Sequence, residues 1–256
     1  MSKKPILLTS KEVKRLKELE QLLMKYKNIL GLEKEDIDIG ISAKNRAFLQ
    51  WYEKEKKWGI YLLPSDNDFT PIHELGHIFL TKKTDYMYFA GSGIKKNKIF
   101  EGLFLILNHL LDCFVDYNLI QFKGLYELYI DDAHLWKDAK NKGNIKGEPI
   151  NIVHSYKTII GYYLSLKIID KMKNHEYFIS VKNYLRKAKR FIQKFYPNNK
   201  FNFQSLEQKL DEFDKIKDTK DPKVIINFFY KILYEISIWN KREIQSQMKL
   251  LFPSTN

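Results

Sequence analysis

The order of apolar and polar residues predicts a chain that begins with one helix and a small sheet. Apolar residues recur at helical spacing from Ser10 to Leu30, with Ser10 as the expected N-cap and Gly31 as the stop. Isoleucines then alternate with polar residues in DIDIGIS, which is typical of a half-buried strand. Two further strands are expected in RAFLQWYEKEKKWGIYLLP, on either side of a polar turn at residues 53–57.

The rest of the pattern is mainly helical. Thr70 followed by Pro71 predicts the start of a helix that runs to about Thr81, because proline is tolerated in the first turn. A polar loop is expected from Lys82 to Asn97, and a long apolar helix from Ile99 to Gln121. Later helices are predicted in DDAHLWKDAK and over residues 150–173, 178–195, 202–217 and 222–250.

A segment rich in Gly, Asn and Lys at residues 141–148 suggests a boundary between two parts. We therefore predict an α+β, predominantly helical protein with two domains. Residues 1–145 would hold the small antiparallel or mixed sheet, and residues 146–256 would form a helical C-terminal domain or extension.

Composition favours a soluble, cytoplasmic protein. The 256 residues are 44% apolar, which suffices for one substantial core. The single Cys113 cannot form an internal disulfide, so a reducing compartment is expected. The first residues lack the apolar run of a signal peptide, and charged residues interrupt the apolar stretch at 99–122, so no membrane span is expected.

The net charge of +13 allows two interpretations. A basic surface can bind nucleic acid or an acidic partner. However, the charge is mostly lysine spread along the chain, and no zinc-finger spacing, RNP signature or basic zipper is present. A solvated, lysine-rich surface is therefore preferred, and nucleic acid stays possible without a motif. The pattern leaves the oligomeric state unknown.

The segment DFTPIHELGHIFL contains the candidate chemistry. His73 and His77 are four residues apart, so a helix places both imidazoles on one face, where they can bind one Zn²⁺. Glu74 is turned about 100° from His73, which suits a general base and acid that acts on the metal-bound water. The alternative is an amphipathic helix with solvated His and Glu, because HExxH also occurs by chance.

A catalytic zinc needs a third protein ligand. Asn108, Asp112 and Asp116 follow one another at four-residue intervals along the long apolar helix, and carboxylates in such surroundings need a cation or a partner. Asp112 is the first choice, with Asp116 and Asn108 as outer-shell residues that orient ligands. The competing third ligands are Glu101, His109 and Asp116. A polar edge that faces solvent would explain the same stripe.

HELGH, preceded by a hairpin and followed by a helix with an acidic ligand, resembles the gluzincin-type zinc metallopeptidases, and especially their shortest, minigluzincin-like members. The resemblance covers roughly Ser10 to Phe122. The usual third-ligand motif of that family is Glu-x-x-x-Asp, and here Asp112-Cys-Phe-Val-Asp116 has Asp in place of Glu. Segments of the form Asn-x-x-x-Asp-x-x-x-Asn/Asp in some proposed metallopeptidases are similar to residues 108–116. DFTPIHE is also similar to regulatory peptidases with Phe-Thr-x-x-His-Glu, whose Glu-x-x-Ala-Asn segment is missing here.

The resemblance implies a zincin-like N-terminal domain that hydrolyses peptide bonds in a peptide or protein substrate, with one catalytic Zn²⁺. It also implies that the edge strand before the HExxH helix pairs with the substrate, and here that strand would comprise Gly59, Ile60, Tyr61, Leu62 and Leu63. A central strand is the alternative. An oxyanion stabiliser is expected near the metal, with His154 preferred to His134, although a lone helical His is often a packing residue.

Another class of function is a catalytically silent or latent zincin-fold protein. Such a protein would act as a binding or regulatory module for nucleic acid or an acidic partner, and its basic C-terminal helices would make the contact.

Overall fold

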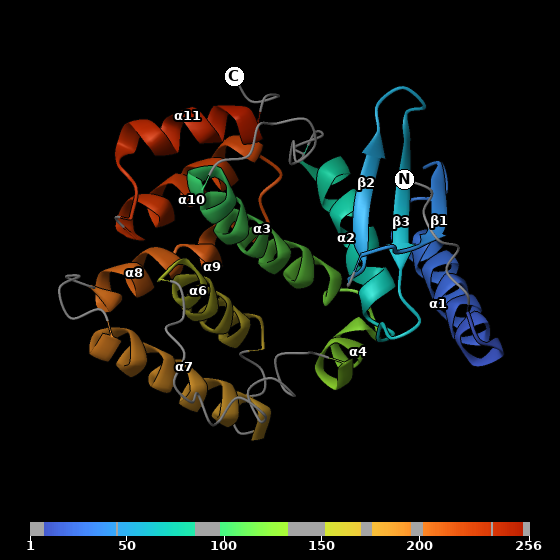
Figure 1. Ribbon diagram of the computed structural model, residues 1–256, viewed down its shortest axis with the longest axis horizontal. Coiled ribbons are helices and arrows are strands. Elements are labelled where there is room, and N and C mark those ends of the chain that lie inside the picture. The colour runs from blue at the N-terminus through green and yellow to red at the C-terminus, as the bar shows by residue number, and fades with distance from the viewer. Residues whose placement is uncertain are drawn as a thin grey trace. The chain divides into compact units, whose positions relative to one another are not determined.

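The computed structural model describes residues 8–44, 46–84, 98–132, 152–169, 176–195, 202–236 and 238–252 (Figure 1). Its secondary structure is predominantly helical, with one small mixed sheet of three strands. The predicted α+β class is therefore confirmed.

The chain divides into two compact units. The first comprises residues 1–80 and 119–132, and the second comprises residues 81–118 and 133–256. The predicted boundary at residues 141–148 lies outside the described residues, so the division into 1–145 and 146–256 stays a prediction.

In the first unit, α1 (Ser10–Ile29) begins one residue before the predicted start. Its N-cap is Thr9, whose side chain accepts from the backbone of Glu12, while the Glu12 carboxylate accepts from the backbone of Thr9. This reciprocal capping box needs Glu at the third helical position, which Thr9 has and Ser10 lacks. Gly31 follows the helix with a positive φ of 67°, a conformation that glycine adopts without strain.

The sheet consists of β1 (Ile37–Ile41), β2 (Phe48–Tyr52) and β3 (Lys57–Leu62), in the order β1-β3-β2. β3 pairs with β1 in parallel and with β2 in an antiparallel hairpin (Figure 1). The prediction that Gly59, Ile60, Tyr61, Leu62 and Leu63 form an edge strand is therefore wrong. β3 is central because β1 occupies the side that the hairpin leaves open, and Leu63 lies beyond the end of the strand.

Two further helices follow the sheet: α2 (Thr70–Lys83), which contains His73 and His77, and α4 (Leu125–Asp132). The loop before α2 is fixed by Arg15 of α1, which donates to Asp68 at 2.6 Å, and by Asn67, which accepts from the backbone and hydroxyl of Thr70 at 2.8 Å. α2 buries apolar residues on one face, and Tyr129 of α4 packs edge-on against Phe69. The helix predicted in DDAHLWKDAK lies almost wholly outside the described residues.

The described helices of the second unit are α3 (Lys98–Leu119), α6 (Ile152–Ile168), α7 (Glu176–Phe195), α8 (Phe203–Leu210), α9 (Phe213–Ile216), α10 (Pro222–Ile236) and α11 (Lys241–Leu251). Part of their core is a group of packed aromatic rings: Phe114, Phe213, Phe228, Phe229 and Phe252. No helix in the described part of the chain is long and apolar enough to span a membrane.

Two predicted helices of this unit are each divided. Residues 202–217 form α8 and α9, and residues 222–250 form α10 and α11 instead of one helix. The second division arises at Asn240, which caps α11 and forms a capping box with Glu243. This cap competes with a continuous helix, because Asn in a helix interior binds nearby backbone groups.

Candidate metal centre

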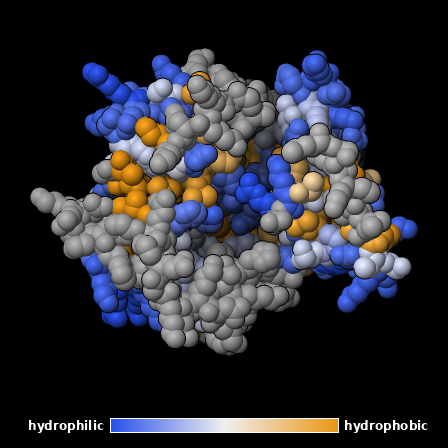
Figure 2. Space-filling view, viewed as in Figure 1, coloured by the Kyte–Doolittle hydropathy of each residue, from blue (hydrophilic) through white to orange (hydrophobic). Residues whose placement is uncertain are grey.

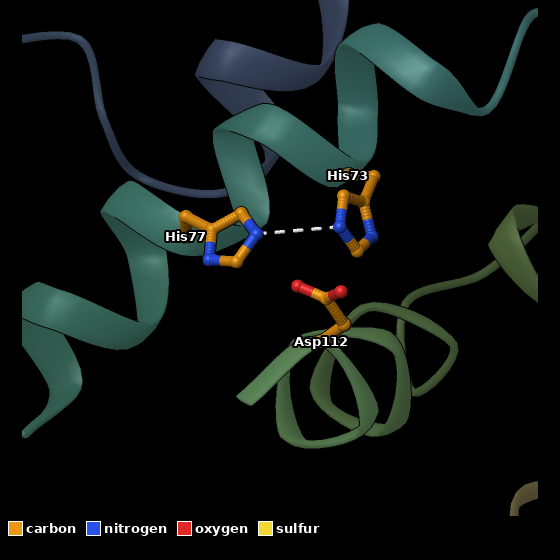
Figure 3. Close-up of side chains that lie close together, drawn as sticks. All are labelled: His73, His77 and Asp112. Atoms are coloured by element: carbon orange, nitrogen blue, oxygen red, sulfur yellow. Dashed lines mark hydrogen bonds between the residues drawn. The ribbon is translucent and has the colours of Figure 1, made fainter. Parts of the chain in front are cut away.

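His73 and His77 lie on successive turns of α2, and both are half-buried. Their Nε2 atoms are 3.2 Å apart, with the ring planes at 87° (Figure 3). Two imidazoles that bind one tetrahedral Zn²⁺ at about 2.05 Å have nitrogens separated by about 3.3 Å. The two rings form an N–H···N hydrogen bond at this distance, and the same separation is the one that a shared metal ion requires.

The local sequence explains why the two rings face away from the core. Ile72, Leu75 and Ile78 are fully buried, so they fix the rotation of α2 about its axis. The histidines occupy another side of the helix. His73 also contacts the buried ring of Phe69, at 6.2 Å between ring centroids, which restricts where its imidazole can point.

Asp112 is a half-buried residue of α3, and its carboxylate is bound by a side chain of the same helix. The Asn108 side-chain nitrogen donates to both carboxylate oxygens, at 3.3 and 3.1 Å. One carboxylate oxygen and one ring nitrogen from each histidine all lie within 4.8 Å of one another, and the three side chains point toward one another in Figure 3. Among the described residues, these three form the one such group of His, Cys, Asp or Glu side chains.

The donor set fits a zinc ion. Two neutral imidazole nitrogens and one carboxylate oxygen are a common catalytic zinc combination, which leaves a fourth tetrahedral position for water or substrate. Ligand atoms around one zinc are about 3.3 Å apart, so the longest separation in the group would shorten by about 1.5 Å.

The other predicted ligands are outside this group. Glu101 is exposed and precedes Asp112 by eleven residues, which is about 16 Å along the helix axis. His109 points its Nε2 at Gly161 of α6, while its Nδ1 lies 3.9 Å from the Asp112 carboxylate. Asp116 is half-buried one turn beyond Asp112. His109 is therefore a neighbour of Asp112 and not a member of the group. Asn108 contacts the Asp112 carboxylate, as expected of an outer-shell residue.

The predicted catalytic residues have different positions. Glu74 is half-buried and follows His73 on α2, so its side chain is turned about 100° from that ligand and is outside the group of three. His154 is exposed on α6. Its role as an oxyanion stabiliser stays a prediction, as does the role of Glu74 as a base. His134 lies outside the described residues.

A hydrogen bond that the sequence did not predict joins the end of α2 to the end of α3. The Lys83 ammonium donates to the Asn118 side-chain oxygen at 2.5 Å, and the Asn118 amide donates to the backbone oxygen of Phe114. Burial lowers the pKa of Lys83. Lys83 comes six residues after His77, and Asn118 comes six residues after Asp112, so the bond lies about 9 Å along each helix from the candidate ligands.

Cys113 does not contribute a nucleophile to this arrangement. Its side chain is buried, and burial raises the pKa of the thiol well above its ordinary value, with a further rise from the charges of Asp116 and Asp112. A buried thiol with a raised pKa stays protonated and unreactive.

Comparison of the chain with protein-family models, with curated proteins and with solved structures finds no match. The functional argument therefore depends on the residues and their geometry.

Proposed function

We propose that this protein is a zinc-dependent metallopeptidase in which His73, His77 and Asp112 bind one Zn²⁺. The observation that carries the proposal is the 3.2 Å separation of the two imidazole nitrogens together with a carboxylate oxygen within 4.8 Å. The order of elements also supports it, since a helix and a small sheet precede the HELGH helix, and a helix with an acidic residue follows. This order agrees with the resemblance to gluzincin-type peptidases.

The polar contacts of Asp112 support its assignment as the third ligand. Asn108 donates to both oxygens of the carboxylate, which fixes the direction of the side chain. The bond between Lys83 and Asn118 connects the helices that carry the ligands.

Glu74 has the chemistry of a general base. A bound zinc ion would supply a Lewis acid that polarises a peptide carbonyl and acidifies a water molecule. The Glu74 carboxylate would take the proton of the attacking water and later deliver it to the departing amine. Its side chain is attached next to a ligand, but is turned away from the ligand position, so it can accept a proton without occupying the metal.

The decisive experiment compares zinc content and peptide cleavage in the parent protein and in Glu74→Gln. The variant should keep its zinc, measured by elemental analysis, while cleavage of a peptide mixture, measured by mass spectrometry, falls by a factor of about 10² to 10⁴. Glu101→Gln is a matched control at an exposed position of α3 and should leave both quantities unchanged.

Two results would contradict the proposal. A parent protein that binds no zinc would remove the metal centre. Cleavage by Glu74→Gln at the parental rate would remove the assigned base.

A further inference from the structure

The exposed side of α7 carries a row of positive charges. Lys182, Arg186, Arg190 and Lys194 follow one another at four-residue intervals, and all four are exposed. At a rise of about 1.5 Å per residue, the Cα atoms of neighbouring members are about 6 Å apart along the axis, and the row is about 18 Å long. Lys187 is exposed beside the row. We call these five residues the α7 basic row.

The opposite side of α7 fixes the orientation of the row. Four apolar residues are buried there: Val181, Leu185, Ala188 and Ile192. At 100° per residue, the α7 basic row fills a sector of about 140°, and the other exposed residues that the structure describes in that sector are Ile179, Asn183 and Gln193. Among the side chains of this sector that the structure describes, from residue 178 onward, none is acidic.

Some described lysines elsewhere are paired with carboxylates. Lys167 lies between Asp211 and Asp214, at 2.6 and 2.7 Å, and Lys231 binds Glu212 at 2.5 Å. Lys189 of α7 itself, at the edge of the exposed side, binds Glu207.

In contrast, Lys182, Arg186 and Arg190 form no ion pair with a carboxylate in the described part of the chain. Like charges four residues apart on a helix repel one another. A polyanion beside the helix would relieve this repulsion.

We propose that the α7 basic row binds the phosphate backbone of duplex nucleic acid, without reading its base sequence. Lys182, Arg186 and Arg190 span about 12 Å along the helix axis, which covers the axial rise of about three to four phosphates of one strand. The exposed part of α7 that the structure describes carries no aromatic ring, whereas single strands are held largely by stacking on such rings. The apolar side of α7 is already buried, so the helix cannot insert into a lipid surface.

Hydrophilic residues cover much of the described surface in Figure 2. Lysine and arginine number 44 in the chain, so positive charge alone does not single out α7. The test must therefore separate this row from the general charge of +13. The proposal does not depend on zinc binding or on peptide cleavage.

The experiment measures the affinity of the full chain for a short fluorescent DNA duplex by anisotropy, from about 50 to 200 mM salt. The triple variant Lys182→Gln, Arg186→Gln, Arg190→Gln removes three cations. Since each phosphate contact contributes about 0.9 to the slope of log K against log salt, the slope should become shallower by about 2.7. The charge-conserving variant Lys182→Arg, Arg186→Lys, Arg190→Lys should keep the parental slope.

A matched control removes the same charge from exposed positions of α1: Lys11→Gln, Lys14→Gln, Lys17→Gln. Circular dichroism checks that each variant keeps the parental helix content. A slope change confined to the α7 variant supports the proposal. Equal slope changes in both triple variants, no duplex binding by the parent protein, equal affinity for a single strand, or tighter binding to anionic vesicles would each overturn it.

Discussion

The side chain of Asn108 offers a test of the metal centre that leaves every proposed ligand in place. Asn108→Ala removes the amide that donates to both oxygens of the Asp112 carboxylate. The carboxylate then loses its fixed direction on α3 and must be oriented by the metal alone. We expect the variant to fold normally, because Ala is a better helix former than Asn, and to bind zinc more weakly.

The magnitude follows from the contact itself. A hydrogen bond to a charged group contributes about 1.5–3 kcal/mol, and each 1.4 kcal/mol corresponds to about a tenfold change in affinity. Loss of an outer-shell partner typically weakens metal binding by about 10- to 100-fold. The two estimates agree, so we expect the zinc dissociation constant to rise by about one to two orders of magnitude.

The assay is a competition between the protein and a chromogenic zinc chelator at fixed pH, with circular dichroism as the measure of folding. Asp112→Ala should weaken binding more than Asn108→Ala does, and Asn183→Ala, at an exposed position of α7, should have no effect. Parental affinity in Asn108→Ala would refute the orienting role of the amide. Parental affinity in Asp112→Ala, with a loss in Asp116→Ala, would show that the third ligand is misassigned.

Two further predictions concern contacts within each unit. Gly161→Ala places a Cβ atom 1.8 Å from the present position of His109 Nε2. We expect it to lower the free energy of unfolding, measured in urea, by about 1–3 kcal/mol through overpacking. In a His109→Ala background the same change should raise it by up to about 1 kcal/mol, from helix propensity, and the same sign in both backgrounds would contradict the contact. The hydrogen bond to Tyr52, together with burial, raises the pKa of Tyr61 to about 12. The folded state then keeps a proton that the unfolded chain loses above about pH 10, so stability falls as the pH rises from 10 to 12. Tyr52→Phe should lower the Tyr61 pKa in ¹³C NMR titrations of labelled tyrosine, and an unchanged value would show that the bond is not the cause.

Local signals predicted the helix that carries the histidines. The turn before α2, the proline at its second position and the apolar spacing all lie within fifteen residues, and together they place His73 and His77 on one side of the helix. The strand segments were predictable for the same reason, because alternation is visible within five or six residues. The N-caps of α1 and α11 were harder to predict from the sequence. Thr9 and Asn240 each depend on a glutamate three residues later, and neither cap was assigned from the sequence.

The choice of the third ligand needed tertiary structure. Glu101, His109, Asp112 and Asp116 share one helix and similar chemistry, and periodicity put several of them near the same stripe. Asp112 is distinguished by its short distance from the two histidines. His109 instead packs against Gly161. The spacing of residues along α3 predicts neither of these two contacts.

By itself, the sequence determined the kinds of element, the pairing of two imidazoles on one helix face and the set of acidic residues that can join them, because these properties depend on neighbours within a few turns. The tertiary structure decided that β3 lies between β1 and β2, that α10 and α11 are separate helices, and which acidic side chain of α3 approaches His73 and His77. Such features depend on contacts between segments far apart in the chain, and a local pattern of polar and apolar residues is compatible with several of those contacts.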